Sequence, residues 1–292
     1  MGASKGICAG IVTYQPEITD LEANLATLMP QVSRVYIVDN GSDNVTDIQS
    51  FVEGRPQLRL LCNSENAGIA KALNQLCRQA KQDGYKWILT MDQDSLSAPD
   101  MVSGLSAYMD NPVYGIIAPR VEFRDGDTLI LSTKDGEKET VEVSACITSG
   151  SLTRIEAWEK VGGFDEWFFI DRVDNEFCIH LAVNGYKVLR VNKALMSQRA
   201  GGMKYIRMPW GKNILLPYYN EKRNYYICRN SVYLFRKYGS VIDTGHQIMA
   251  FIYAQLIKLL FEGNRVKTLV SSVKGIRDGF KKEVEYCNYS SK

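Results

Sequence analysis

The chain has 292 residues, enough for one large α/β domain or for one domain with an appendage. Hydrophobic residues make up 45% and charged residues 23%, the composition of an ordinary soluble globular protein. Seven scattered cysteines without a C-x-x-C pair, and only two histidines, argue against a zinc site and for free thiols in a reducing compartment. The first residues lack the basic start and long apolar run of a signal peptide, so we expect a cytoplasmic protein.

The net charge of +2 hides an uneven distribution. Residues 203–292 contain 16 Lys and Arg against 6 Asp and Glu, whereas the rest of the chain contains 19 against 27. An acidic body followed by a basic end indicates that the end meets something anionic, such as phosphate or a membrane surface. We therefore divide the chain into a body of residues 1–200 and a basic, mainly helical region of residues 201–292.

The first part of the chain alternates buried apolar runs with helical patterns. Strands are predicted at Ile7–Tyr14, Val35–Val38, Leu58–Cys62 and Trp87–Met91. Helices are predicted at Thr19–Leu28, with Thr19 as N-cap, and at Asn66–Lys81. Strands that alternate with helices over short connections favour an α/β fold with a parallel sheet and crossover helices.

The second part is less regular. Further strands are predicted at Ile116–Pro119, Val143–Thr148 and Tyr186–Val191, with a charged hairpin between Val121 and Glu142. Short helices are predicted after Ala98-Pro99-Asp100, at Glu156–Val161 and at Asn175–Val183. Beyond Ser197 the sequence becomes basic and aromatic, and then forms apolar helices.

Polar clusters follow the predicted strands at the points where the strands end. They are Thr13-Tyr14, Asp39-Asn40, Asn63–Gly68 and Asp92–Asp94. Ligands of parallel α/β sheets bind beyond the carboxyl ends of the strands, so these clusters predict one binding site.

Asp92-Gln93-Asp94 follows the most apolar of these strands. Carboxylates two residues apart point to one side of an extended segment and form an oxygen-rich corner. Mg²⁺ prefers such oxygens and completes its shell with water and substrate phosphates. The motif therefore predicts a divalent cation that holds a diphosphate, although an Asp-x-Asp pair taken alone is more often a turn or cap.

Several motifs together resemble the family 2 glycosyltransferases of the GT-A type. They are Val12-Thr13-Tyr14, Val38–Ser42, Asn66–Asn74, Met91–Ser95 and Gly162–Glu166. Two further phrases, Phe169–Glu176 and Arg223–Asn230, resemble the bacterial rhamnosyltransferases of O-antigen and cell-wall polysaccharide assembly. The resemblance covers about residues 7 to 235. It implies a GT-A, Rossmann-like catalytic and nucleotide-sugar-binding domain over residues 1–200, with a C-terminal helical extension.

The resemblance assigns most of the strand-end residues to the donor nucleotide sugar. Asp39 would accept from a thymine or uracil ring between Thr13 and Tyr14, although Asp39 also fits an Asx-turn and Tyr14 simple packing. The remaining donor contacts would be Asn40, Asn66, Gly68, Asn74 and Asp92. Asn74 could equally be a solvent-facing helical residue. Asp94 would bind Mg²⁺ or Mn²⁺, with Asp92 as the second carboxylate of the metal site.

The resemblance also implies inversion at the anomeric carbon, with a carboxylate base at the start of a helix. The general family phrase Glu-Asp-x-Asp/Glu reads Val173-Asp174-Asn175-Glu176 here, so Asp174 is the predicted base and Asp171 the alternative. An N-cap role also suits Asp174. Ser149, Gly150 and Trp167 are predicted near the acceptor. Trp167 could also belong to the core.

Many relatives carry a histidine after the late strand, whereas this chain reads Leu195-Met196-Ser197-Gln198-Arg199. Arg199, Lys204 and Arg207 could supply positive charge to the diphosphate instead, or they could be ordinary surface residues. Farther on, Gln247–Phe261 is apolar but too short for a comfortable membrane span. Basic residues follow it, so this region would lie on an anionic membrane surface, or pack on the catalytic domain or on a second copy.

We therefore predict an enzyme, a hexosyltransferase that moves L-rhamnose from dTDP-L-rhamnose to a lipid-linked oligosaccharide in O-antigen or cell-wall polysaccharide biosynthesis. Its partners would be the donor and a glycan or polyprenyl-diphosphate-linked acceptor, with the inner face of the cytoplasmic membrane or a second copy as further partners, but no nucleic acid. One alternative is a family 2 transferase that uses a UDP-hexose. Another is a nucleotide-sugar-binding assembly scaffold, against which the base and metal carboxylates argue.

Overall fold

The computed structural model describes residues 6–133, 136, 138–200, 203–207, 211, 213–217, 219–261 and 264–284, and only the backbone of 203–207 and 213–217. Contacts divide the chain into two compact units. Unit 1 contains Met1–Phe169 and Val173–Ala200. Unit 2 contains Gly201–Lys292 together with the three residues Ile170–Arg172.

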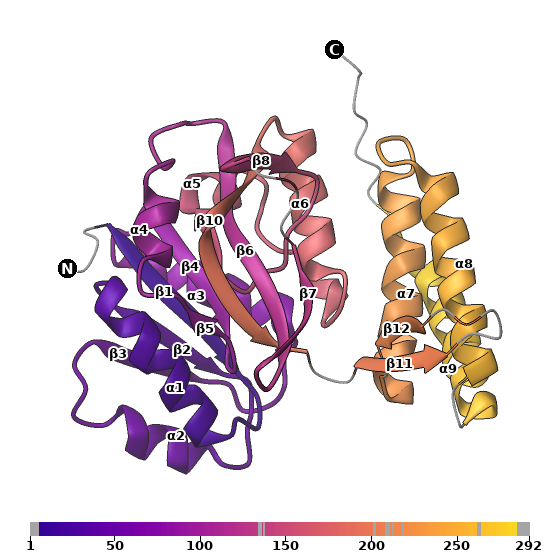
Figure 1. Cartoon of the computed structure of the whole chain (residues 1–292), viewed down its shortest axis with the longest axis horizontal. Coiled ribbons are helices and arrows are strands. Elements are labelled where there is room, and N and C mark those ends of the chain that lie inside the picture. The colour runs from indigo at the N-terminus through magenta and orange to yellow at the C-terminus, as the bar shows by residue number, and fades with distance from the viewer. Residues whose placement is uncertain are drawn as a thin grey trace. The chain divides into compact units, whose positions relative to one another are not determined.

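Unit 1 is built on a mixed sheet (Figure 1). Its strands are β1 (Ile7–Thr13), β2 (Val35–Asp39), β3 (Leu58–Cys62), β4 (Trp87–Asp92), β5 (Leu96–Ser97), β6 (Tyr114–Asp125), β7 (Thr128–Ser132), β8 (Thr140–Val143), β9 (Ser151–Arg154) and β10 (Lys187–Arg199). They lie in the order β3-β2-β1-β4-β9-β6-β10-β5, with β7 beside β6 and β8 beside β10. The run β3-β2-β1-β4 is parallel, as predicted, whereas β9 is antiparallel to both of its neighbours.

Short and medium helices connect these strands. They are α1 (Ile18–Leu28), η1 (Met29–Gln31), α2 (Val45–Val52), α3 (Ile69–Gln82), α4 (Met101–Ser106), α5 (Ile155–Lys160), η2 (Glu166–Phe168) and α6 (Val173–Val183), where η marks a 3₁₀ turn. The expected N-cap of α1 was wrong: Glu17 takes that position and Thr19 lies inside the helix. The predicted strand Val143–Thr148 was also wrong, since β8 ends at Val143 and the sheet resumes at β9.

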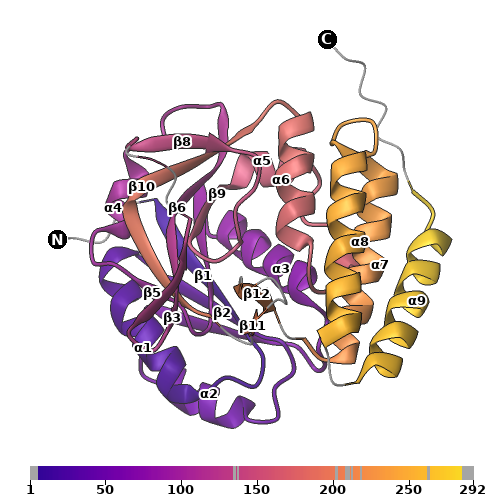
Figure 2. The ribbon, with the colours of Figure 1, turned by 45° about the vertical axis from the view of Figure 1, so that its right-hand side comes forward.

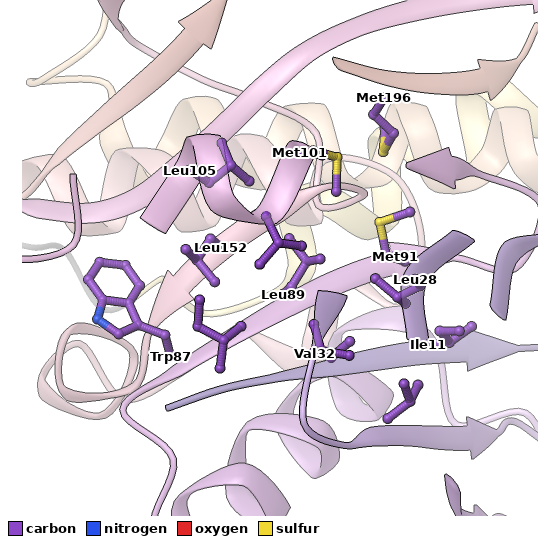
Figure 3. Close-up of a cluster of buried hydrophobic side chains, with 14 of the residues drawn as sticks. Ile11, Leu28, Val32, Trp87, Leu89, Met91, Met101, Leu105, Leu152 and Met196 are labelled. Atoms are coloured by element: carbon purple, nitrogen blue, oxygen red, sulfur yellow. The ribbon is translucent and has the colours of Figure 1, made fainter. Parts of the chain in front are cut away.

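One face of the sheet holds the main hydrophobic cluster (Figure 3). Side chains of β1, β4 and β9 interlock there with helices α1 and α4, through residues such as Ile11, Leu28, Leu89, Met101 and Leu152. Burying each such side chain contributes roughly 1.5–3 kcal/mol. Helix α3 packs on the opposite face. The carboxyl ends of β1, β2 and β4 are thereby fixed side by side.

Unit 2 contains the hairpin β11 (Met203–Arg207) and β12 (Asn213–Pro217) and the helices α7 (Glu221–Tyr238), α8 (Thr244–Phe261) and α9 (Arg265–Lys281). The three helices lie side by side in both views (Figures 1 and 2). Asn224 contacts residues 268–272 and Arg236 contacts residues 279–282, so α7 and α9 run in the same direction. Among the residues that the structure describes, no helix has the length and hydropathy needed to cross a bilayer.

Candidate active site

The last residue of β4, Asp92, is held on three sides at the strand-end edge of the sheet. Its amide donates to Ser149 Oγ at 2.9 Å, and its carbonyl accepts from Asn24 Nδ2 at 2.7 Å. Its Oδ2 accepts from Gln198 Nε2 at 2.8 Å. Helix α1, strand β10 and the loop before β9 therefore all fix this one residue.

Asp94 lies in the loop just beyond. Burial raises the pKa of its carboxyl above the ordinary value, because the charged form loses hydration; nearby Arg199 acts in the opposite direction. Arg199 itself forms a two-pronged ion pair with Asp20, with both N···O distances 2.9 Å. A cation bound at Asp94 would stabilise the charged carboxylate and so offset the hydration that burial removes.

Gln198 supplies a test of whether these residues suit a metal ion. Its Oε1 is buried and accepts no hydrogen bond from the described part of the chain. The same side chain donates to Asp92, so this oxygen lies on a group already fixed at the motif. No cluster of three or more His, Cys, Asp or Glu side chains is found within the described ranges. The two carboxylates and the amide oxygen are all hard oxygen donors of the kind that Mg²⁺ and Mn²⁺ accept, so the residues fit such an ion.

The carboxylate of Asp39 is fully used inside the protein. One oxygen accepts from the amides of Gly41 and Ser42 at 3.2 and 3.0 Å. The other accepts from the hydroxyls of Ser42 and Thr13 at 2.5 and 3.2 Å. Asp39 has no exposed surface. These bonds are those of an Asx-turn, and a contact with a nucleotide base would have to replace one of them.

A chain of amides joins β2 to the start of α3. Asn40 donates to Asn66 Oδ1 at 3.1 Å and accepts from the Ala67 amide at 3.0 Å. Asn66 Oδ1 also accepts from the Gly68 amide. Gly68 has φ +88°, and a Cβ there would lie 2.6 Å from the Phe169 ring, so only glycine fits. The first helical amide of α3, that of Ile69, donates to Phe169 O rather than pointing into a free site.

Tyr14 is half exposed beside the metal motif. Its amide donates to Gln93 Oε1 at 2.9 Å, and Gln93 Nε2 donates back to its carbonyl at 3.4 Å. Tyr14 is 47% exposed, and its predicted contact with the nucleotide base stays a prediction.

Asn74 occupies neither position that the sequence suggested. It is buried, and its amide group makes four hydrogen bonds of 2.9–3.0 Å, to Trp158 Nε1, Glu166 Oε1 and both the N and the O of Phe164. These hydrogen bonds use both amide hydrogens and the carbonyl oxygen of the side chain, and all of them go to the segment from α5 to η2. The structure therefore corrects the expected donor contact to a role inside the fold.

The three residues predicted near the acceptor lie in different surroundings, and their contact with an acceptor stays a prediction. Ser149 is buried, and its hydroxyl binds the Asp92 amide and Ser95 Oγ, so it supports the metal motif. Gly150 is buried behind it and donates to Thr90 O at 2.7 Å. Trp167 is half buried in η2, with its ring edge-on to Phe168 at 6.4 Å.

Asp174 lines a cavity of about 250 Å³ in unit 1. The other walls include Ser149, Asn175, Arg190 and the apolar residues of β6. Arg190 Nη2 is buried and finds no acceptor in the described part of the chain. Because Ser149 Oγ holds the Asp92 amide, one residue connects the cavity of Asp174 with the metal motif.

Asp171 is already paired within unit 2. Its carboxylate accepts three hydrogen bonds of 3.0–3.1 Å from the Arg223 guanidinium. Asn230 donates to the carbonyls of Ile170 and Asp171 at 2.7 and 2.8 Å. The two phrases Phe169–Glu176 and Arg223–Asn230 are thus joined by direct bonds. Asp171 is thus engaged with Arg223, whereas Asp174 lines the cavity in unit 1, and the choice between them as base stays a prediction.

A family model described as glycosyl transferase family 2 matches residues 8–182. The chain belongs to glycosyltransferase family 2. The dTDP-rhamnosyl transferase RfbF of Shigella flexneri is 30% identical over 297 residues, which cover 95% of this chain and 96% of that protein. An N-acetylglucosaminyltransferase of Rhizobium meliloti (strain 1021) is 31% identical over 112 residues, 37% of this chain and 26% of that protein.

Solved structures share the fold of this glycosyltransferase. GalNAc-T7 with UDP, GalNAc and Mn²⁺ superposes with a TM-score of 0.63 at 11% identity, over 94% of this chain and 56% of that one. Residues 1–349 of S. aureus TarS in complex with UDP-GlcNAc superpose with a TM-score of 0.61 at 15% identity, over 94% of this chain and 80% of that one. The predicted GT-A fold with C-terminal helices is confirmed.

The sequence did not predict two residues of the site of this family 2 glycosyltransferase, and the side chains of two predicted ones lie outside the described residues. Asn24 was missed, although a polar residue within the apolar stripe Leu21, Leu25 and Leu28 is itself a signal of a buried role. Gln198 was noted only as the absence of a histidine, and its bond to Asp92 depends on the path of β10. Lys204 and Arg207 belong to β11, whose side chains lie outside the described residues, so their predicted role stays a prediction.

Proposed function

We propose that this glycosyltransferase transfers L-rhamnose from dTDP-L-rhamnose to a lipid-linked oligosaccharide, with inversion and with a divalent metal ion, in O-antigen or cell-wall polysaccharide synthesis. The reaction centre is the strand-end edge where Ser149 joins the cavity of Asp174 to the motif Asp92–Asp94. That connection carries the proposal, because an inverting transfer needs the base with its acceptor hydroxyl and the departing diphosphate on opposite sides of one anomeric carbon. The donor assignment is supported by the similarity to the dTDP-rhamnosyl transferase, which extends over nearly the whole chain.

In this proposal Asp174 is the general base. Its carboxylate takes the proton of the acceptor hydroxyl as the oxygen attacks the anomeric carbon of the donor. The bond from that carbon to the diphosphate oxygen breaks at the same time, and the nucleoside diphosphate leaves with the electron pair. The cavity beside Asp174 would admit the acceptor sugar.

The motif residues prepare the other side of the reaction. Asp94, Asp92 and the Gln198 amide oxygen would hold Mg²⁺ or Mn²⁺, which when bound neutralises charge on the departing diphosphate. The hydrogen bonds from Gln198, Asn24 and Ser149 keep Asp92 in place before the substrate arrives. Tyr14 would pack against the nucleotide base.

A thermal-shift panel tests the donor. The protein is melted with dTDP-rhamnose, UDP-glucose, UDP-N-acetylglucosamine or GDP-mannose, each with and without Mn²⁺. A donor at about 100 times its Kd should add roughly 2.7 kcal/mol of stability. We expect a metal-dependent shift with dTDP-rhamnose and none of that size with the other sugars.

A metal-dependent shift with a UDP-sugar alone would reject the rhamnosyl assignment and retain the enzyme class. That alternative is kept because the N-acetylglucosaminyltransferases of the family match part of this chain. A shift that is independent of Mn²⁺ would instead contradict the metal site.

A further inference from the structure

Helix α9 has its polar and apolar faces reversed relative to a helix of a water-soluble domain. Its buried residues, which include those packed against α7, are small or polar: Thr268, Ser271, Ser272, Gly275 and Gly279. Five of its six large apolar residues are instead exposed, between half and three quarters of their surface: Val266, Leu269, Val270, Val273 and Phe280. In water, the large apolar side chains of such a helix stay hydrated and contribute little hydrophobic stabilisation.

The contact between α7 and α9 depends on those small residues. A Cβ at Gly275 would lie 2.4 Å from Tyr225 O, and one at Gly279 would lie 2.5 Å from Arg229 O. Asn224 reinforces the contact, because its amide donates to Ser271 Oγ and Ser272 Oγ at 2.9 Å. Close backbones at small residues and side-chain hydrogen bonds between helices are the way helices pack when lipid surrounds them.

Helix α8 also exposes most of its large apolar side chains. Within its 18 residues only Ile257 and Lys258 are buried. Large apolar side chains are exposed at intervals of one, three or four residues, which places them along one side of the helix: Ile248, Met249, Ile252, Tyr253, Leu256 and Leu260. These residues and the five exposed apolar residues of α9 form what we call the apolar face of unit 2. A monomer in water rarely leaves so many large apolar side chains exposed together without a binding role.

A groove between α7 and α9 adds cationic groups beside the apolar face. It has a volume of about 460 Å³ and is lined by Val266 and Val270 of that face and by Tyr225 and Tyr226. Lys222, Lys267 and Lys274 also line it, together with Glu221, which forms an ion pair of 3.7 Å with Lys267, so two lysines remain in excess over the one carboxylate. Apolar walls with ammonium groups suit an amphiphile that carries a negative charge.

The positive charge of this region favours an anionic membrane over a second copy of the chain as the partner of the apolar face. Residues 244–284 contain seven Lys and Arg and three Asp and Glu. A two-fold dimer would bring this positive charge against itself, since each copy presents the same patch. Anionic lipid headgroups attract each such residue by about 1 kcal/mol.

We propose that the apolar face of α8 and α9 docks on a membrane surface rich in anionic lipids, with the two helices lying in the headgroup region. The basic residues of α9 and of the groove would contact the headgroups, and the exposed Val, Leu, Ile and Phe side chains would enter the acyl boundary. This inference rests on unit 2 alone and does not depend on the identity of the donor sugar.

Vesicle flotation with the full chain tests the proposal. One set of vesicles contains phosphatidylcholine alone, and the other contains equal parts of phosphatidylcholine and phosphatidylglycerol. We expect the protein to float with the anionic vesicles, at least about tenfold more than with the neutral ones, and to be released as salt is raised. Sedimentation velocity without lipid reports the oligomeric state.

Variants separate the apolar and the electrostatic contributions. Leu256→Glu combined with Val270→Glu should weaken partitioning by at least about tenfold, since both side chains are exposed and would enter the lipid. Lys267→Gln and Lys274→Gln should each weaken it by about fivefold. Leu129→Glu is the matched control, because Leu129 is an equally exposed apolar residue of β7, and it should bind as the wild type does. Circular dichroism melting confirms that each variant is folded.

Three results would overturn the proposal. Full-length protein that stays unbound with anionic vesicles would do so, as would binding that the Leu256 and Val270 changes leave intact. A dimer in lipid-free solution that these same changes convert to monomer, without vesicle binding, would assign the face to a second copy.

Discussion

Asp94 is a half-buried acid, and the hydration that its carboxylate loses works against the folded protein. Because its pKa is raised in the fold above the ordinary value of 3.8, the folded state holds the proton more tightly than the unfolded state does. The stability that this group contributes is therefore fully present below pH 3.8 and is lost as the pH rises through the raised pKa. At neutral pH the ionised carboxylate is a cost that a bound cation would offset.

Asp94→Asn should accordingly have two opposite effects. Without metal at pH 7 the variant should melt at a higher temperature than the wild type, and this gain should shrink toward pH 4. The stabilisation by Mn²⁺ and donor together should disappear. Asp127→Asn, in the exposed hairpin turn, is the control and should change neither property. Mn²⁺ stabilisation that persists in Asp94→Asn would move the metal site elsewhere.

Asp174→Asn should lower transfer by roughly 10²–10⁴-fold, because it removes the proposed base without changing the size of the side chain. Donor affinity should stay nearly unchanged, which a thermal-shift titration with dTDP-rhamnose would measure beside the rate. If the variant keeps wild-type turnover, the base lies elsewhere, and Asp171 would then be tested next.

At the scale of elements, the parallel arrangement of the first four strands and the convergence of their ends could be predicted from the sequence, whereas their order in the sheet was not. Apolar runs with polar residues at their carboxyl ends depend on local pattern alone, and β1, β2, β3 and β4 all follow it. The antiparallel strand β9 was misplaced by several residues because the stretch before it is apolar without being paired. A short apolar run does not by itself distinguish a strand from a loop, and residues 144–148 form a loop whose residues are exposed or half-buried.

The candidate site was predictable in kind but less so in detail. Thr13, Asp39 and Asp92 do gather at one edge, as strand ends must. The hydrogen-bond partners that decide each role come from distant segments, as Asn74 shows through its bonds to residues of α5 and the following loop. Because these partners are distant in the sequence, the residues next to Asn74 give no indication of them.

Asn74 joins α3 to the segment from α5 to η2, so replacing it should destabilise the packing of both. Asn74→Ala would leave the Trp158 and Phe164 N–H groups buried without an acceptor, and we expect the free energy of unfolding to fall by roughly 2–5 kcal/mol. Urea unfolding measures this. Gln82→Ala, on the exposed surface of α3, is the control and should change stability by less than about 0.5 kcal/mol. An equally small effect at Asn74 would contradict its role.

At the scale of the whole molecule, the pair Asp171 and Arg223 joins distant parts of the sequence within unit 2. Arg223→Met should lower the free energy of unfolding by about 1–2 kcal/mol, a modest value because the guanidinium is partly exposed. Asp171→Asn in the same background should recover part of the loss, because it removes the unpaired charge and Asn tolerates the left-handed backbone of residue 171 (φ +64°). A double-mutant cycle in urea measures the coupling, and additive effects would mean that the pair contributes nothing.

The short segment Ile170–Arg172 belongs to unit 2, although the residues on either side of it belong to unit 1. The chain therefore passes from unit 1 into unit 2 at Ile170 and back into unit 1 at Val173. It enters unit 2 again at Gly201 and stays there. The two units cannot be exchanged between relatives as cassettes with a single junction. A chimera joined at residue 200 would inherit residue 171 from one parent and residue 223 from the other, and it would keep their ion pair only where both parents carry complementary charges there.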